Sequence, residues 1–326
     1  MQPNAIVQTT QAGSGSSTGG DPGDDRARAH RHHAHRHRAR DLLTRALLVV
    51  VWSSGFISGK LGLRYSAPYT FATLRFAIAG SVLLLMALVR RDVWPGWRLL
   101  GHLAVAGVLV QAVQFSSIYM GMELGVPSGL AALIIALYPL TASLLAVPVL
   151  RERVTRGQCL GLVLGLGGVA LAVSENLHLD GGYLAGLGFL LLALLGISAG
   201  TVYQKRFCRG MEPVTGNAVQ LLAAAVATVL PALFAEGFDV TFTADYWPAL
   251  LWASVINSIV GVGLLYALLQ RHGTSQVSSL FYLVPMVTAA LAALLLDQRL
   301  GPLMLGGLAM ATAGTLLTQR RERRRG

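Results

Sequence analysis

The sequence predicts an all-α, polytopic membrane protein with ten transmembrane helices arranged as two inverted five-helix repeats. Three observations predict this fold: long apolar runs alternate with short polar connections, basic residues gather on alternate connections, and the two halves of the chain resemble each other weakly. Only 13% of the 326 residues are charged, whereas a soluble domain usually carries about a quarter. Composition therefore excludes an ordinary soluble protein.

Each apolar run is about as long as a bilayer requires. A helix needs about 20 apolar residues to cross roughly 30 Å of hydrocarbon, and it satisfies its own backbone polar groups there. The ten expected helices are 42–63, 69–89, 99–120, 128–150, 158–174, 183–203, 214–235, 247–269, 277–296 and 302–318.

The two ends of the chain lie outside the expected helices. Residues 1–41 are first Gly/Ser-rich and then alternate Arg with His, a low-complexity composition for which we expect disorder. Residues 319–326 form a short basic tail. Between the tails we expect two domains, a first five-helix repeat over 42–175 and a second over 183–318. The tail histidines leave metal binding open as an alternative to a solvated basic arm beside anionic lipid, and we expect no metal site elsewhere.

The basic residues predict the orientation. With the N-terminus in the cytoplasm, 22 of the 26 Lys and Arg residues fall in inside connections or tails, and only Lys60, Arg64 and Arg299 fall outside. Cytoplasmic connections carry the excess of basic residues in membrane proteins. We therefore expect ten crossings of the cell inner membrane with both termini cytoplasmic. Because the net charge of +11 forms no continuous basic face, we expect no nucleic-acid partner.

An offset near 145 residues aligns the two halves. It pairs Lys60 with Lys205, and an offset of 146 pairs Pro139 with Pro285. Each half contains five expected crossings, an odd number, so the second half enters the membrane from the opposite side. Inverted repeats of this kind are the usual build of secondary transporters.

The motifs WSSGFISGK, TLRF, YP and RER resemble, in their order and spacing, the EamA-type transporters of the drug/metabolite transporter superfamily over residues 45–318. The resemblance implies a central cavity lined by helices 1–4 and 6–9, with helices 5 and 10 peripheral. It also implies secondary, mostly outward transport of small metabolites such as amino acids, their derivatives or drug-like molecules. The sequence departs from the family's pattern where Glu152 follows Arg151 instead of a glycine, and where Gln298 replaces the second acidic residue.

Polar and aromatic side chains within the expected helices are the candidates for substrate binding. Ionisable groups are costly inside hydrocarbon and suggest function. Arg75 either contacts an anionic substrate, or it snorkels towards the interface or bonds to carbonyls of a neighbouring helix. Amides and phenols can bind a zwitterion, but they also form interhelical hydrogen bonds and interfacial aromatic belts. The candidate cavity residues are Trp52, Arg75, Gln111, Gln114, Tyr119, Tyr138, Gln220, Asn257, Tyr266 and Tyr282.

Two matched prolines and a glycine stripe concern the helices themselves. Pro139 and Pro285 fall inside the fourth and ninth expected helices, where a proline removes a backbone hydrogen bond. We expect them to act as gating hinges or as static kinks. Gly157, Gly161 and Gly165 favour close helix packing, either within the protomer or in a homodimer through peripheral helices.

These features predict a secondary transporter that binds a small metabolite and exports it by alternating access. The expected partners are that small-molecule substrate and the lipid bilayer, with no cofactor and no catalytic residue. A membrane-embedded enzyme is the alternative, but His102, His178 and His272 lie apart, without the spacing of a catalytic or metal site. A non-transporting sensor or scaffold is a second alternative, which would not need matched prolines or an inverted duplication.

Overall fold

The computed structural model describes the backbone of residues 22–150, 155–175 and 181–322. It describes the side chains of these residues except 22–40, 156, 272–276, 278–279 and 315–322. Contacts divide the chain into two units, Met1–Leu43 and Thr44–Gly326, and the helical bundle is the second. Within the described residues the fold is all-helical, as predicted, apart from one isolated β-bridge between Ser66 and Val240.

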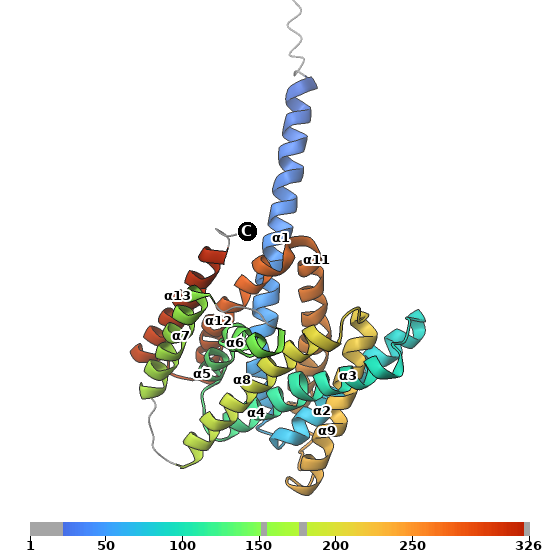
Figure 1. Ribbon diagram of the computed structural model, residues 1–326, viewed down its shortest axis with the longest axis vertical. Coiled ribbons are helices and arrows are strands. Elements are labelled where there is room, and N and C mark those ends of the chain that lie inside the picture. The colour runs from blue at the N-terminus through green and yellow to red at the C-terminus, as the bar shows by residue number, and fades with distance from the viewer. Residues whose placement is uncertain (1–21, 151–154, 176–180, 323–326) are drawn as a thin grey trace, which may run out of the picture. The chain divides into compact units, whose positions relative to one another are not determined.

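Sixteen helical elements make up the described chain (Figure 1). In order they are α1 (Pro22–Gly62), α2 (Pro68–Arg90), α3 (Trp97–Gly107), η1 (Val108–Val113), α4 (Gln114–Glu123), α5 (Ser128–Ile135), α6 (Tyr138–Leu150), α7 (Arg156–Glu175), α8 (Gly181–Phe207), α9 (Pro213–Phe234), α10 (Tyr246–Leu251), η2 (Trp252–Gly261), α11 (Val262–Ser278), η3 (Ser279–Leu283), α12 (Val284–Leu296) and α13 (Pro302–Glu322).

Eight stretches of the described residues are long and apolar enough to cross a bilayer. They are Asp41–Gly62, Pro68–Arg90, Trp97–Glu123, Ser128–Leu150, Gly157–Glu175, Gly181–Phe207, Pro213–Phe234 and Tyr246–Arg271. Two shorter apolar helices, Leu280–Leu296 and Pro302–Gly314, follow in the places of the ninth and tenth expected crossings. The count of ten therefore stays a prediction.

The segment for which we expected disorder is helical where it is described. Helix α1 begins at Pro22 rather than near Leu42, and residues 1–21 lie outside the described part of the chain. Alanine and arginine are both strong helix formers, and they make up much of this segment. The disorder of the tail as a whole stays a prediction.

Two of the long spans contain a π-helical stretch at equivalent places. In Trp97–Glu123 the stretch is η1, and in Tyr246–Arg271 it is η2. Turns of this kind are rare and often occur at functional sites. The two stretches belong to the third helix of each half, which is the first structural likeness between the halves.

The expected interior position of Pro139 and Pro285 is wrong. The chain breaks between α5 and α6, and Pro139 lies in the first turn of α6. Likewise, the 3-10 stretch η3 precedes α12, whose first turn holds Pro285. A proline in a first turn has no intrahelical hydrogen bond to lose. Each proline thus lies in the first turn of an α-helix, after a turn in the first half and after the 3-10 stretch in the second, and the hinge role stays a prediction for these interruptions of the α-helix.

Equivalent helices of the two halves pack against each other. Helix α7 lies along α13, α2 lies along α9, and α5 contacts α12, and the first pair forms one edge of the bundle in Figure 1. The α7–α13 contact depends on glycine, because a Cβ at Gly168 would lie 2.5 Å from the Gly307 carbonyl oxygen. The stripe residues Gly161 and Gly165 lie at the same crossing, because a Cβ at Gly314 would lie 3.0 Å from the carbonyl oxygen of Gly161 and 3.5 Å from the amide nitrogen of Gly165, so this part of the stripe packs within the protomer.

Candidate functional site

A cavity of about 350 Å³ lies within the bundle. Its lining side chains come from α1, α2, η1, α4, α5, α6, α8, α9, η2, α11, η3 and α12, and none comes from the side chains that the structure describes in α7 and α13. The fifth and tenth expected helices are thus peripheral to the cavity, and the other eight surround it. A volume of this size suits one small molecule.

Nine of the ten sequence-predicted cavity residues line this space. They are Trp52, Arg75, Gln111, Gln114, Tyr119, Tyr138, Gln220, Asn257 and Tyr266. Tyr282 is buried but does not line it, whereas its neighbour Phe281 does. Both residues belong to η3, where three residues rather than 3.6 complete a turn. The residue that faces the cavity at this point therefore differs from the one that a continuous α-helix would present to it.

Arg75 is a buried cation on the cavity wall. Its side chain is only 3% exposed, and its Nε and Nη2 atoms both donate to the Ser258 hydroxyl at 3.2 Å. Its Nη1 atom donates to the Tyr119 hydroxyl, and its guanidinium carbon lies 4.1 Å from the centroid of the Phe115 ring. The side chain therefore neither snorkels nor bonds to backbone carbonyls among the described residues.

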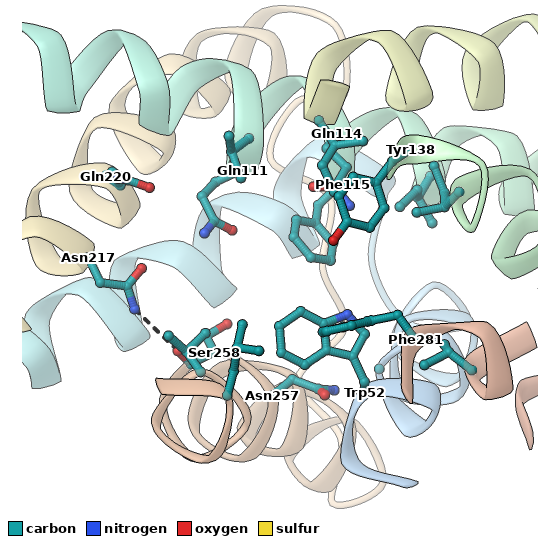
Figure 2. A pocket seen from close by; sticks show the side chains of 18 of the residues that line it. Trp52, Gln111, Gln114, Phe115, Tyr138, Asn217, Gln220, Asn257, Ser258 and Phe281 are labelled. Atoms are coloured by element: carbon teal, nitrogen blue, oxygen red, sulfur yellow. Dashed lines mark hydrogen bonds between the residues drawn. The ribbon is translucent and has the colours of Figure 1, made fainter. Parts of the chain in front are cut away.

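Figure 2 shows the amides of Gln111, Asn217 and Gln220 on one side of the cavity, and on the other side a group of rings beside which the amides of Gln114 and Asn257 also lie. On the first side, Asn217 donates to the Ser258 carbonyl at 3.5 Å, and Gln220 contacts the Met211 sulfur at 3.7 Å. On the other side, the rings of Trp52 and Phe281 meet edge to face with centroids 4.9 Å apart. The cavity can therefore offer both hydrogen bonds and aromatic contacts to one bound molecule.

Asn257 has a structural role as well as a place on the wall. With its amide turned so that the nitrogen faces a carbonyl, it donates to Val51 O at 2.5 Å and accepts from the Gly55 amide at 3.1 Å. The interhelical hydrogen bond, one of the two interpretations open from the sequence, is thus present between η2 and α1. Gln114 also faces the cavity (Figure 2) and is 6% exposed.

Sequence reasoning missed several lining residues. Asn217 lies three positions before Gln220, on the same face of α9, so helical spacing could have found it. Ser258 directly follows Asn257 in the π-helical stretch. Phe115 and Phe281 carried no signal, because an aromatic residue in an apolar helix looks the same whether it faces a cavity or the core.

The two ends of the bundle differ. At one end the α1–α2 and α9–α10 connections pair through Thr241 N to Tyr65 O at 2.7 Å and Ala67 N to Asp239 O at 3.2 Å. None of the lining residues comes from these connections. The cavity instead reaches Met211 in the α8–α9 connection. Among the described residues, the cavity therefore stops short of the first end and extends towards the second.

Comparison with known proteins agrees with this architecture. The sequence model of the EamA-like transporter family matches residues 41–174 and again residues 184–320. Probable amino-acid metabolite efflux pumps of Salmonella typhimurium and Escherichia coli are each 30% identical over 289 residues, covering 84% of this chain and 93% of theirs. An uncharacterized transporter of Bacillus subtilis is 26% identical over 291 residues, covering 85% of this chain and 91% of its own. A solved crystal structure aligns with a TM-score of 0.60 at 17% identity, covering 88% of this chain and 98% of that one, a likeness that shows the fold alone.

Proposed function

The chain belongs to the EamA-like transporter family, and from this premise we propose that it exports small amino-acid-like metabolites by alternating access. The family and the relatives are transporters rather than enzymes, and the long apolar helices agree with a multi-pass inner-membrane protein. The relatives named as amino-acid metabolite efflux pumps support the substrate class and the outward direction. The observation that carries the proposal is the cavity, which is enclosed by eight helices and extends towards one end of the bundle.

Two inverted repeats are the second part of the proposal. The double match to the family model supports them, as do the equivalent π-helical stretches and the equivalent interruptions of the α-helix before Pro139 and Pro285. The glycine contacts between α7 and α13 also repeat. Gly168 meets Gly307, and a Cβ at Gly314 would lie 3.0 Å from the carbonyl oxygen of Gly161. An offset of 146 residues exchanges these two contacts, as a twofold relation between the halves requires.

A carboxylate between the halves supports a gate at the end of the bundle where the α1–α2 and α9–α10 connections pair. The carboxylate of Glu236, in the α9–α10 connection, accepts from the backbone amides of Tyr69 and Thr70 at 2.9 and 2.8 Å. It also accepts from the Thr70 hydroxyl at 2.9 Å. These bonds cap the N-terminus of α2 with a residue of the other half. Opening this end requires breaking them.

The equivalent cap in the second half is local. Thr215 lies 145 residues after Thr70, and its amide and hydroxyl donate to Glu212 at 2.8 and 3.0 Å. Glu212 precedes α9 in the same connection, so this cap ties nothing across the halves. The asymmetry supports an arrangement in which the Glu236 end is held closed while the other end is open. By the charge distribution, the Glu236 end faces outwards.

Transport in proteoliposomes tests the proposal. We expect the purified chain to move labelled amino acids or their N-acyl derivatives faster than protein-free liposomes do, and a pH gradient across the membrane identifies proton coupling. Ile197→Trp fills the cavity from α8, whereas Leu195→Trp places the same side chain on a 54% exposed position of that helix. We expect the first variant to abolish transport and the second to retain it. Equal rates in both variants would show that the cavity is not the transport path.

A further inference from the structure

We propose that Arg75 is the carboxylate-binding residue of the cavity and that the substrate is recognised by its carboxylate, with the amino group contributing little. The inference rests on the proposed function, because it assigns the substrate class of the same cavity. Four observations carry it: the unpaired charge of Arg75, the geometry of its donors, the absence of acidic groups from the described lining, and the aromatic lining of the cavity.

The charge of Arg75 has no counter-ion within the part of the chain that the structure describes. No Asp or Glu oxygen of those residues lies within 4.0 Å of the guanidinium, although the side chain is 97% buried. Its partners are the hydroxyls of Ser258 and Tyr119, which are uncharged. A buried cation is costly unless an anion compensates it. A bound anion supplies that compensation from the cavity.

The donors of Arg75 are arranged for a two-oxygen acceptor. Nε and Nη2 form one edge of the planar guanidinium, and both converge on the single Ser258 oxygen at 3.2 Å. A carboxylate accepts from such an edge through two parallel bonds, which are shorter and stronger than bonds to a neutral oxygen. The Phe115 ring stacks on the guanidinium at 4.1 Å and leaves its edges free to bond.

Tyr119 completes the subsite. Its hydroxyl accepts from Nη1 of Arg75, which leaves the phenolic proton for donation to an anion beside the guanidinium. Its ring is held edge to face by Phe71 with centroids 5.1 Å apart, so the hydroxyl is fixed before any ligand arrives. The Ser258 hydroxyl donates to Ala253 O at 3.1 Å and thus also keeps a fixed orientation.

The described lining offers no carboxylate to an ammonium group. Arg75 is the only charged residue among the described side chains that line the cavity. An ammonium group would meet only uncharged groups there: amides such as Asn217 and Gln220, hydroxyls such as that of Tyr138, and the faces of aromatic rings. Removing the positive charge of a substrate's amino group should therefore change the free energy of binding little. Removing the negative charge of its carboxylate should weaken binding, because it leaves the charge of Arg75 without a counter-ion.

The aromatic lining of the cavity indicates the rest of the molecule. Trp52, Tyr138 and Phe281 line one side of it (Figure 2), and the whole space is about 350 Å³. The substrate class is therefore a small carboxylic acid with an apolar or aromatic side chain, whose amine is free or acylated.

Two matched compounds test the inference, N-acetyl-L-phenylalanine, which keeps only the carboxylate, and L-phenylalaninamide, which keeps only the amine. We expect the wild-type chain in proteoliposomes to transport the acid at least tenfold better than the amide, judged by kcat/KM. Arg75→Gln should lower kcat/KM for the acid roughly ten- to a hundredfold and change that for the amide less than about twofold. Arg64→Gln removes a charge from an exposed position and should change neither.

Two milder variants keep the test decisive if Arg75→Gln does not fold. Tyr119→Phe and Ser258→Ala keep the charge and most of the packing, and each should lower the ratio of acid to amide transport severalfold. Equal transport of acid and amide by the wild-type chain, or equal losses of both in the variants, would overturn the inference while leaving a transporter. If the wild-type chain moves no compound of a wider metabolite panel, the proposed function fails together with the inference.

Discussion

The Ser53 hydroxyl on α1 donates to the carbonyl oxygen of Val284 at 3.2 Å, and Val284 directly precedes Pro285. The same contact recurs in the other direction, because Ser198 on α8 donates at 3.5 Å to the carbonyl oxygen of Tyr138, directly before Pro139. Ser198 lies 145 residues after Ser53. The first helix of each half thus holds the start of the proline-bearing helix of the other half, at the point where the α-helix is interrupted.

Removing these hydroxyls should lower stability by unequal amounts. Ser53→Ala loses one buried hydrogen bond and should cost about 1 kcal/mol of unfolding free energy. Ser198→Ala should cost more, because Ser198 also bonds to the Thr141 hydroxyl at 2.5 Å. Ser174→Ala, on an exposed turn with a local bond, is the control and should be neutral. Thermal unfolding in detergent gives the order of stability of the three variants. A Ser198→Ala variant as stable as Ser174→Ala would contradict the prediction.

The crossing of α7 and α13 should not tolerate a methyl group. Gly168→Ala would place its Cβ against the backbone of Gly307, and Gly307→Ala would do the same against Gly168. Overpacking of this kind costs about 1–3 kcal/mol. Gly188→Ala meets nothing within 4 Å on α8 and should be neutral or stabilising by up to about 1 kcal/mol, since alanine favours helix. The unfolding temperatures of the three variants test this prediction, and equal temperatures would exclude a close crossing of α7 and α13.

The Glu236 bonds predict a shift between conformations. Glu236→Ala removes the cap of α2 that comes from the other half, and losing a cap costs about 1 kcal/mol. If those bonds exist only while this end is closed, the open population should rise about fivefold. A cysteine placed at Ile118 on the cavity wall should then react faster with an impermeant maleimide added outside. Glu212→Ala removes a cap within one half and should not raise that rate; an equal rise in both would contradict the gate.

Much of the site could be predicted from the sequence because the membrane restricts where polar groups go. A glutamine or arginine inside an apolar helix cannot face lipid cheaply, so Arg75, Gln111 and Gln114 had to face protein, and the structure brings all three to one cavity. The positions at which two helices begin, Pro68 and Ser128, follow likewise from the limits of the apolar runs.

The remainder depends on contacts between distant residues. Glu236 caps α2 from a position 166 residues beyond Thr70, and nothing near either residue in the sequence indicates the pairing. The α-helix is interrupted before Pro139 and before Pro285 for a similar reason. A proline permits both a kink within a helix and the start of a new one, and packing between the halves decides which occurs.

The orientation of the bundle yields a last prediction, which uses single cysteines at two exposed arginines. Arg64 lies at the same end as Glu236, and Arg209 lies in the α8–α9 connection. An impermeant maleimide should label Arg64→Cys from outside intact cells and Arg209→Cys only after the cells are opened. The native Cys159 is exposed and must be replaced first, whereas Cys208 is buried. Burial raises the pKa of the Cys208 thiol, so less of the reactive thiolate exists at neutral pH, and its slow labelling should speed up only as the pH rises. Labelling of both introduced cysteines from the same side would contradict the orientation and, with it, an outward-facing Glu236 gate.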